Sequence, residues 1–136
     1  MGVDDGVEQV DLDTLLHHAD VVSLHARVTA ETTGLIGERE LGLMKDGAYF
    51  INTARGPLVD SVALAAALRA GEIGAAGLDV FESEPEVPAE LLEAPRCVLL
   101  PHIGSATTRA RDAMAGLVAE NVLAALAGTE PPNRVA

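Results

Sequence analysis

Four short apolar runs, separated by stretches with helical spacing, constrain the fold of this chain more than any other feature. The runs are Ala19–Leu24, Ala48–Ile51, Ala75–Val80 and Val98–Leu100. Short apolar runs that alternate with helical segments are typical of buried parallel strands joined by helices. Apolar residues make up 49% of the chain and aromatic residues only 2%, so the core must be built mainly from Ala, Val, Leu and Ile. The sequence therefore predicts an α/β fold with a parallel sheet.

The clearest helix signal lies between the second and third apolar runs. Asp60 is suited to cap a helix over Val62–Ala70, and Gly71 is suited to end it. The residues that would share its apolar face are Leu64, Ala67 and Leu68. The other expected helical segments are 11–18, with Asp11 or Asp13 as its cap, Glu38–Met44, a turn at Ala89–Leu92, and a long final helix that is capped by Thr107 or Thr108 and reaches about Leu126.

Charge and cysteine content exclude several classes of partner. The formal net charge of -12 opposes binding to nucleic acid and to anionic membranes, because both kinds of binding need basic surfaces. No apolar run approaches the roughly 18 residues of a membrane span. The single cysteine, Cys97, lies in an apolar run, which is typical of a buried thiol. A reducing cytoplasm is the expected setting.

Three charged residues each follow one of the predicted strands. Arg55 comes after the second apolar run, Glu84 after the third and His102 after the fourth. The carboxyl ends of parallel strands meet at one edge of a sheet, where ligands bind in open α/β folds. Reduction of a 2-keto acid needs a cation for the carboxylate and carbonyl, a proton donor, and a partner that keeps this donor charged. The three side chains match these needs.

Each of these residues alone also has an ordinary structural explanation. A lone arginine after a strand is most often an ion-pair donor on the surface. For Glu84, which lies in a polar loop, an ordinary surface role is more common still. His102 precedes a Gly-Ser turn at the entrance of a predicted helix, where binding residues are common. Their joint occurrence is what favours a functional interpretation.

Several stretches of the chain resemble those of a known family. They are Ala19–His25, Thr29–Gly37, Met44–Asp60, Gly77–Pro85 and Pro101–Thr107. In combination they resemble the carboxyl-terminal part of the NAD-binding domain of the D-isomer-specific 2-hydroxyacid dehydrogenases. The resemblance implies that residues 1–136 form the second half of a partial, Rossmann-like doubly wound parallel sheet, followed by a long C-terminal helix. It also implies hydride transfer between a nicotinamide and a small 2-keto or 2-hydroxy acid.

The resemblance assigns a role to each of the three charged residues. His102 would be the general acid that protonates the keto oxygen, and the general base in the oxidation direction. Glu84 would hydrogen-bond His102 and favour its protonated form. Arg55 would bind the substrate carboxylate and carbonyl oxygen, for which a planar fork of donors is well suited.

The same resemblance implies a set of cofactor contacts. Asp79 would face the nicotinamide carboxamide, and the backbone at Thr53, Ala54, Gly104 and Ser105 would line the ring pocket. A further contact, beside the adenosine end, would come from His25, although a structural histidine at a strand end is about equally consistent with the sequence.

One departure from the family lies in the loop after the first run. Arg27 stands where the family usually has proline, and it could hold a 2′-phosphate or simply face solvent. The expected cofactor is therefore NAD, with NADP open. His17 and His18 lie on a predicted helix without metal-like partners, so no metal site is predicted.

A second departure is that the chain has no G-x-G-x-x-G turn. We expect that half of the domain to precede Met1, together with parts of a substrate domain. Two hypotheses follow. The chain belongs to a functional dehydrogenase, homodimeric through its cofactor domain, or it is a non-catalytic remnant or dimerising module of the same fold. The sequence does not identify the 2-hydroxy acid.

Overall fold

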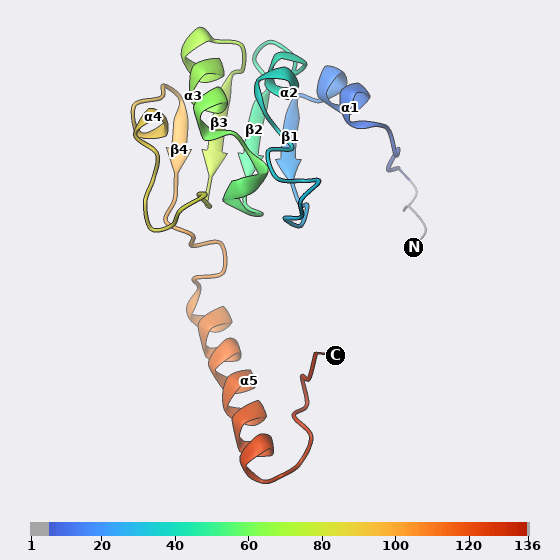
Figure 1. Ribbon diagram of the computed structural model, residues 1–136, viewed down its shortest axis with the longest axis vertical. Coiled ribbons are helices and arrows are strands. Elements are labelled where there is room, and N and C mark those ends of the chain that lie inside the picture. The colour runs from blue at the N-terminus through green and yellow to red at the C-terminus, as the bar shows by residue number, and fades with distance from the viewer. Residues whose placement is uncertain (1–5, 136) are drawn as a thin grey trace. The chain divides into compact units, whose positions relative to one another are not determined.

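The computed structural model describes residues 6–135, which contain one four-stranded parallel sheet (Figure 1). The strands are β1 (Val21–Leu24), β2 (Tyr49–Asn52), β3 (Ala75–Leu78) and β4 (Cys97–Leu99), and they lie side by side in chain order. Each strand falls within or overlaps one of the four apolar runs. The predicted α/β fold with a Rossmann-like parallel sheet and a C-terminal helix is therefore confirmed.

The chain divides into two compact units, Met1–Pro101 and His102–Ala136. The first, which we call the sheet unit, contains the sheet and five short helical segments. These are α1 (Leu12–His18), α2 (Glu38–Gly42), the 3₁₀ turn η1 (Gly56–Leu58), α3 (Ser61–Ala70) and α4 (Ala89–Leu92). The second, the helical unit, contains α5 (Thr108–Leu126).

The helix ends of the sheet unit follow capping chemistry. Asp11 caps α1 by accepting a hydrogen bond from the backbone N–H of Thr14 at 2.8 Å, which decides between the two predicted caps. Asp60 caps α3 as predicted, and Gly71 ends that helix in the left-handed conformation, with φ of 78°. α2 ends at Gly42, short of the predicted Met44, because glycine inside a helix costs backbone entropy and the next residues continue only as a turn.

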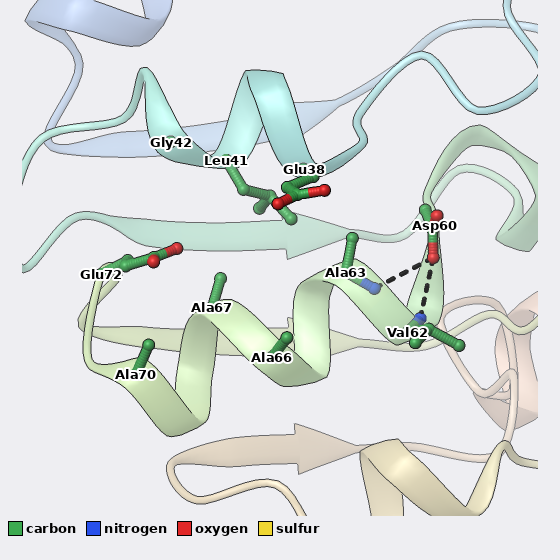
Figure 2. A pocket seen from close by; sticks show the side chains of 10 residues that line it. All are labelled: Glu38, Leu41, Gly42, Asp60, Val62, Ala63, Ala66, Ala67, Ala70 and Glu72. Carbon is green, nitrogen blue, oxygen red and sulfur yellow. Dashed lines mark hydrogen bonds between the residues drawn. The ribbon is translucent and has the colours of Figure 1, made fainter.

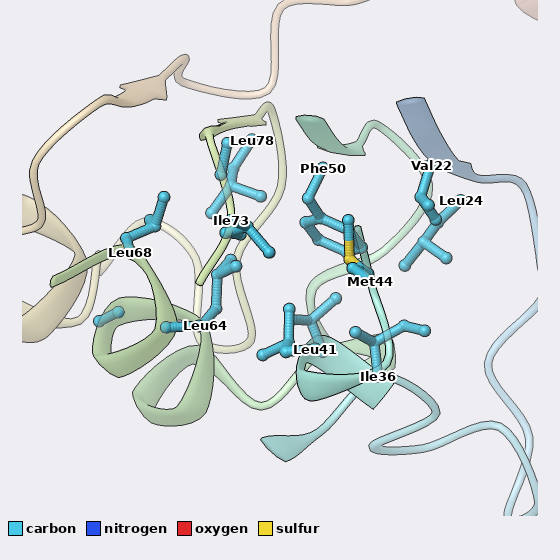
Figure 3. Close-up of a cluster of buried hydrophobic side chains, with 14 of the residues drawn as sticks. Val22, Leu24, Ile36, Leu41, Met44, Phe50, Leu64, Leu68, Ile73 and Leu78 are labelled. Atoms are coloured by element: carbon cyan, nitrogen blue, oxygen red, sulfur yellow. The ribbon is translucent and has the colours of Figure 1, made fainter. Parts of the chain in front are cut away.

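The core lies between the sheet and the helices α2 and α3 (Figure 3). Burial alternates along the strands, so that one face of the sheet carries Val22, Leu24, Ala76 and Leu78 into this core. Phe50 is fully buried at its centre. The core is therefore mainly aliphatic, as predicted, but it has an aromatic residue at its middle. The remaining core residues drawn in Figure 3 with labels are Ile36, Leu41, Met44, Leu64, Leu68 and Ile73.

The helical unit has the predicted N-cap but none of the burial seen in the sheet unit. The Thr107 hydroxyl oxygen accepts a hydrogen bond from the N–H of Ala110 at 3.2 Å, which fixes the start of α5 at Thr108. Asn121 donates to the carbonyl of Leu117 and accepts from the N–H of Asn133, so it ties the helix to the turn that follows. Across residues 6–135, no helix has the length and apolar composition needed to cross a membrane.

Candidate active site at the carboxyl edge of the sheet

The strands of the sheet end in register at one edge. Leu24 pairs with Asn52, Asn52 with Leu78, and Leu78 with Leu99. The segments that leave these strands therefore start side by side, as the topology argument predicted. The predicted site residues His25, Thr53 and Asp79 are the first residues after β1, β2 and β3.

The loop that carries Arg55 is held by a buried side chain at the end of β2. Asn52 is 1% exposed, and both ends of its side-chain amide are used. The amide nitrogen donates to the carbonyl of Arg55 at 2.9 Å, and the amide oxygen accepts from the N–H of Ala54 at 3.0 Å. This is the local turn that asparagine favours. It presents Arg55 as an exposed side chain at the edge of the sheet, with one guanidinium nitrogen donating to the carbonyl of Ala54 at 2.6 Å.

Glycine follows Arg55 because another backbone comes too close for a side chain. A Cβ atom at Gly56 would lie 2.0 Å from the carbonyl carbon of Phe81 and 2.3 Å from the nitrogen of Glu82. The segment that contains Phe81 is itself held by Glu84, whose carboxylate accepts a hydrogen bond from the N–H of Phe81 at 3.0 Å. The loop of Arg55 and the loop of Glu84 are therefore in direct contact through the backbones of Gly56 and Phe81.

Asp79 is the first residue after β3, on the segment that leads to Phe81 and Glu84. It is buried, and its N–H donates to the carbonyl of Asn52 at 3.0 Å. A buried carboxylate at a strand end is costly without polar partners, and such residues are common at binding sites. The environment of Asp79 is consistent with the predicted cofactor contact, which stays a prediction.

One cavity brings together four of the predicted residues. It measures about 520 Å³ and is lined by His25, Ala26, Arg27, Val28, Thr53, Ala54 and Arg55. Its lining residues include two arginines and no carboxylate, so an anionic ligand would be favoured there. Arg27, the residue that departs from the family pattern, lies on its wall.

The wall of this cavity that follows β1 is shaped by hydroxyl groups. The hydroxyl of Thr32 donates to the carbonyl of Arg27 at 2.6 Å, and its oxygen accepts from the N–H of Thr29 at 2.8 Å. His25 lies with its Nε2 atom 3.0 Å from the hydroxyl of Ser23. The contact with Ser23 is the structural role that the sequence left open for His25, and the position on the cavity wall is equally compatible with cofactor binding.

A second cavity of similar size lies between α2 and α3 (Figure 2). It is lined by an alanine-rich face of α3 and by three acidic residues, Glu38, Asp60 and Glu72. Asp60 is occupied in capping α3, through hydrogen bonds to the N–H groups of Val62 and Ala63 (Figure 2). The sequence analysis did not predict this groove, since it depends on how two helices pack.

The remaining predicted site residues lie in the helical unit. His102 is its first residue and has a left-handed backbone, with φ of 53°. Gly104 and Ser105 follow in a turn in which the N–H of Ala106 donates to the carbonyl of Ile103 at 2.9 Å. The roles predicted for His102, Gly104 and Ser105 stay predictions. Within residues 6–135, no group of three or more metal-ligating side chains is close enough to hold a metal ion.

Comparison with known proteins identifies the class of protein to which this chain belongs. Residues 2–104 match the family model described as D-isomer specific 2-hydroxyacid dehydrogenase, NAD binding domain. The chain belongs to this family. This match confirms the family membership that the resemblance predicted.

Individual relatives agree with this assignment. The chain is 54% identical over 130 residues to a glyoxylate reductase of Thermococcus litoralis, covering 96% of this chain and 39% of that protein. Two solved structures superpose closely on it. The TT0316 protein of Thermus thermophilus has a TM-score of 0.92 and 47% identity, over 100% of this chain and 44% of that one. An NADPH-dependent glyoxylate/hydroxypyruvate reductase of Sinorhizobium meliloti, solved with NADP and malonate, has a TM-score of 0.86 and 36% identity, over 99% and 43%. The chain spans about two-fifths of the length of these relatives.

Two elements of the site were missed by reasoning from sequence. Asn52 directly follows the apolar run Ala48–Ile51 and carried only the general turn preference of asparagine. Gly56 is needed because of a backbone approach from a segment more than twenty residues away in the chain, for which the sequence has no local signal.

Proposed function

We propose that this chain is the carboxyl-terminal part of the cofactor domain of an NAD(P)-dependent D-2-hydroxyacid dehydrogenase. The observation that carries the proposal is the cavity at the carboxyl edge of the sheet, which gathers His25, Thr53, Ala54 and Arg55 in a chain of the NAD-binding family. NAD is the proposed cofactor. NADP stays open, because Arg27 lies on the wall of the cavity and a relative of the same fold is NADPH-dependent.

The proposed substrate is a small 2-keto acid. Arg55 is exposed beside the cavity and carries a permanent positive charge, so its guanidinium can bind the carboxylate and the keto oxygen together. Glyoxylate and hydroxypyruvate are the first substrates to test, because relatives with these activities in their names share 54% and 52% identity with the chain. Phosphoglycerate and lactate are the alternatives from the same family.

The proposed reaction adds a hydride and a proton across the keto group to give a 2-hydroxy acid. Bound nicotinamide would supply the hydride. In the proposal His102 donates the proton to the keto oxygen and takes it back in the oxidation direction, and Glu84 is its carboxylate partner. Asp79, Gly104 and Ser105 are proposed contacts of the nicotinamide.

The assembly and setting are also proposals. We propose a homodimer formed through the cofactor domain, in a reducing cytoplasm, without nucleic acid or membrane partners. The net charge of -12 supports the last point. A single cysteine, Cys97, allows no disulfide within these 136 residues, which supports the reducing compartment.

A chimera tests the proposed activity. This chain replaces the matching 130 residues of the Thermococcus litoralis glyoxylate reductase, and reduction of glyoxylate is followed by the consumption of NADH and, separately, NADPH. We expect turnover with at least one cofactor. Arg55→Ala and His102→Asn should each lower kcat/KM by about 100-fold or more. Asparagine is chosen for position 102 because it tolerates the left-handed backbone observed there.

Glu84 needs a more conservative change, because its carboxylate also holds the N–H of Phe81. Glu84→Gln keeps an oxygen for that hydrogen bond and removes the charge, and it should also lower kcat/KM by about 100-fold. Arg69→Ala is the matched control for the loss of a cation, since Arg69 lies on α3 and donates to the carbonyl of Glu90. Wild-type rates in any of the three site variants would disprove the role assigned to that residue.

The second hypothesis, a non-catalytic module that dimerises, makes a different prediction for the same chimera. It predicts that a folded chimera shows no turnover with either cofactor, and that the 136-residue chain alone is a stable dimer. Size-exclusion chromatography with light scattering on the chain, together with the chimera assay, separates the two hypotheses.

A further inference from the structure

We infer that Asn52 is a positioning residue for Arg55, the side chain proposed to bind the substrate carboxylate. The inference rests on the proposed function, because it concerns how that site is held. In this inference the buried, neutral side chain of Asn52, at the end of β2, orients the exposed cation of Arg55 three residues later.

The contacts of Asn52 account for both of its polar groups. The side chain is 1% exposed, and its nitrogen and oxygen bond to the carbonyl of Arg55 and to the N–H of Ala54. A buried amide that spans its own loop in this way fixes the peptide group before Ala54 and the peptide group after Arg55. Aspartate has the same size but lacks the donor, so it cannot reproduce the pair of contacts.

The backbone of Asn52 is also fixed, so the side chain acts from a rigid base. Asn52 pairs with Leu24 and Leu78 in the sheet, and its carbonyl accepts from the N–H of Asp79. Residues on strands hold a site more rigidly than residues on loops. The turn from 52 to 55 is therefore anchored to the sheet at one end.

The other end of the turn is held by the close approach at Gly56. The backbone of Gly56 abuts the carbonyl of Phe81, so the segment after Arg55 has no room to shift toward that side. The Arg55 guanidinium donates to the carbonyl of Ala54, the residue whose N–H Asn52 holds. The direction of the guanidinium is thereby coupled to the Asn52 amide through a single residue.

Asn52→Asp in the active chimera tests this inference. The substitution removes the donor to the Arg55 carbonyl and keeps an acceptor for Ala54. We expect kcat/KM for glyoxylate to fall by about 100-fold, mostly through KM, because a misdirected cation binds the carboxylate less well. A normal KM in a folded Asn52→Asp protein would overturn the inference.

A double-mutant cycle with Arg55 separates positioning from a purely structural role. If Asn52 acts through Arg55, Asn52→Asp should cause no further loss of kcat/KM in the Arg55→Ala background. If it only supports the fold, the loss should be the same in both backgrounds, and the inference would be wrong. An inactive parent chimera would instead disprove the proposed function, so the two failures are distinguishable.

Two further variants control for folding and for the loss of an asparagine. Asn52→Ser, whose hydroxyl oxygen can still accept from Ala54, replaces Asn52→Asp if that protein does not fold, with the same expected rise in KM. Asn121→Asp is the matched control, because Asn121 also donates to a carbonyl and accepts from an N–H, but within the helical unit. Its KM and kcat should stay within about twofold of the parent values.

Discussion

The sheet unit and the helical unit both have helices with apolar residues at similar spacing, but these residues are buried only in the sheet unit. In the sheet unit, Phe50, Leu64 and Leu68 are each fully buried. In α5, all of whose residues the structure describes, no side chain is buried, and Leu117 is 47% exposed. Helical spacing of apolar residues therefore does not by itself produce a core. The stability that burial provides is concentrated in the sheet unit of this chain.

Truncation of a large side chain in each unit should give the largest difference. Phe50→Ala should lower the free energy of unfolding of the sheet unit by about 3–5 kcal/mol, because it leaves a cavity at the centre of the core. Leu117→Ala should change stability by less than about 0.5 kcal/mol, because its side chain already contacts solvent. Urea unfolding of the 136-residue chain, followed by the fluorescence of Tyr49 and by circular dichroism, measures both. Equal losses would show that α5 is packed against a partner surface.

Replacement of a glycine by alanine should change stability in opposite directions in the two units. Gly56→Ala should destabilise the sheet unit by about 1–3 kcal/mol, because its Cβ would lie 2.0 Å from the carbonyl carbon of Phe81. Gly116→Ala should stabilise α5 by about 0.5–1 kcal/mol, because no atom outside its chain neighbours and the backbone of its own helix lies within 4 Å of its Cβ position and alanine favours the helix.

Thermal unfolding and the helical signal in circular dichroism report the two effects of the glycine substitutions. The comparison between the units would fail if Gly56→Ala left the melting temperature unchanged. It would also fail if Gly116→Ala reduced the helical signal, since that would require a close neighbour at this position of α5.

Features that depend on residues close together in the chain could be predicted from the sequence, and features that depend on distant residues could not. Strands β1 to β4 and the cap at Asp60 could be predicted from local patterns of residues. The cap of α5 was narrowed to Thr107 or Thr108, and the hydrogen bond from the N–H of Ala110 identifies Thr107. The carboxyl-edge placement of Arg55 followed from the topology rule for parallel sheets.

The details that escaped prediction depend on contacts across the chain. The need for glycine at position 56 comes from the backbone of Phe81, and the groove between α2 and α3 comes from the packing of two helices. The turn made by Asn52 is local, but its sequence signal was hidden because the residue ends a buried strand. His102 stays a predicted site residue, because it begins the helical unit and its role rests on the pattern of charged residues after the strands and on the resemblance.

The smallest expected difference concerns the two helix caps. Asp60→Ala should lower the free energy of unfolding by about 1 kcal/mol, because α3 packs into the core and loses two capping hydrogen bonds, of 2.9 and 3.0 Å. Thr107→Ala removes one bond, of 3.2 Å, from a helix without buried side chains. Its effect should be confined to fraying of the first turn of α5.

Amide hydrogen exchange distinguishes these two outcomes of cap removal. In Asp60→Ala, protection should fall across the whole sheet unit, including the amides of β2, because the unit unfolds cooperatively. In Thr107→Ala, only amides near Ala110 should exchange faster. If Thr107→Ala also reduced protection in the sheet unit, the two units would share one cooperative transition, and the contrast between a self-sufficient sheet unit and an unburied helix would have to be abandoned.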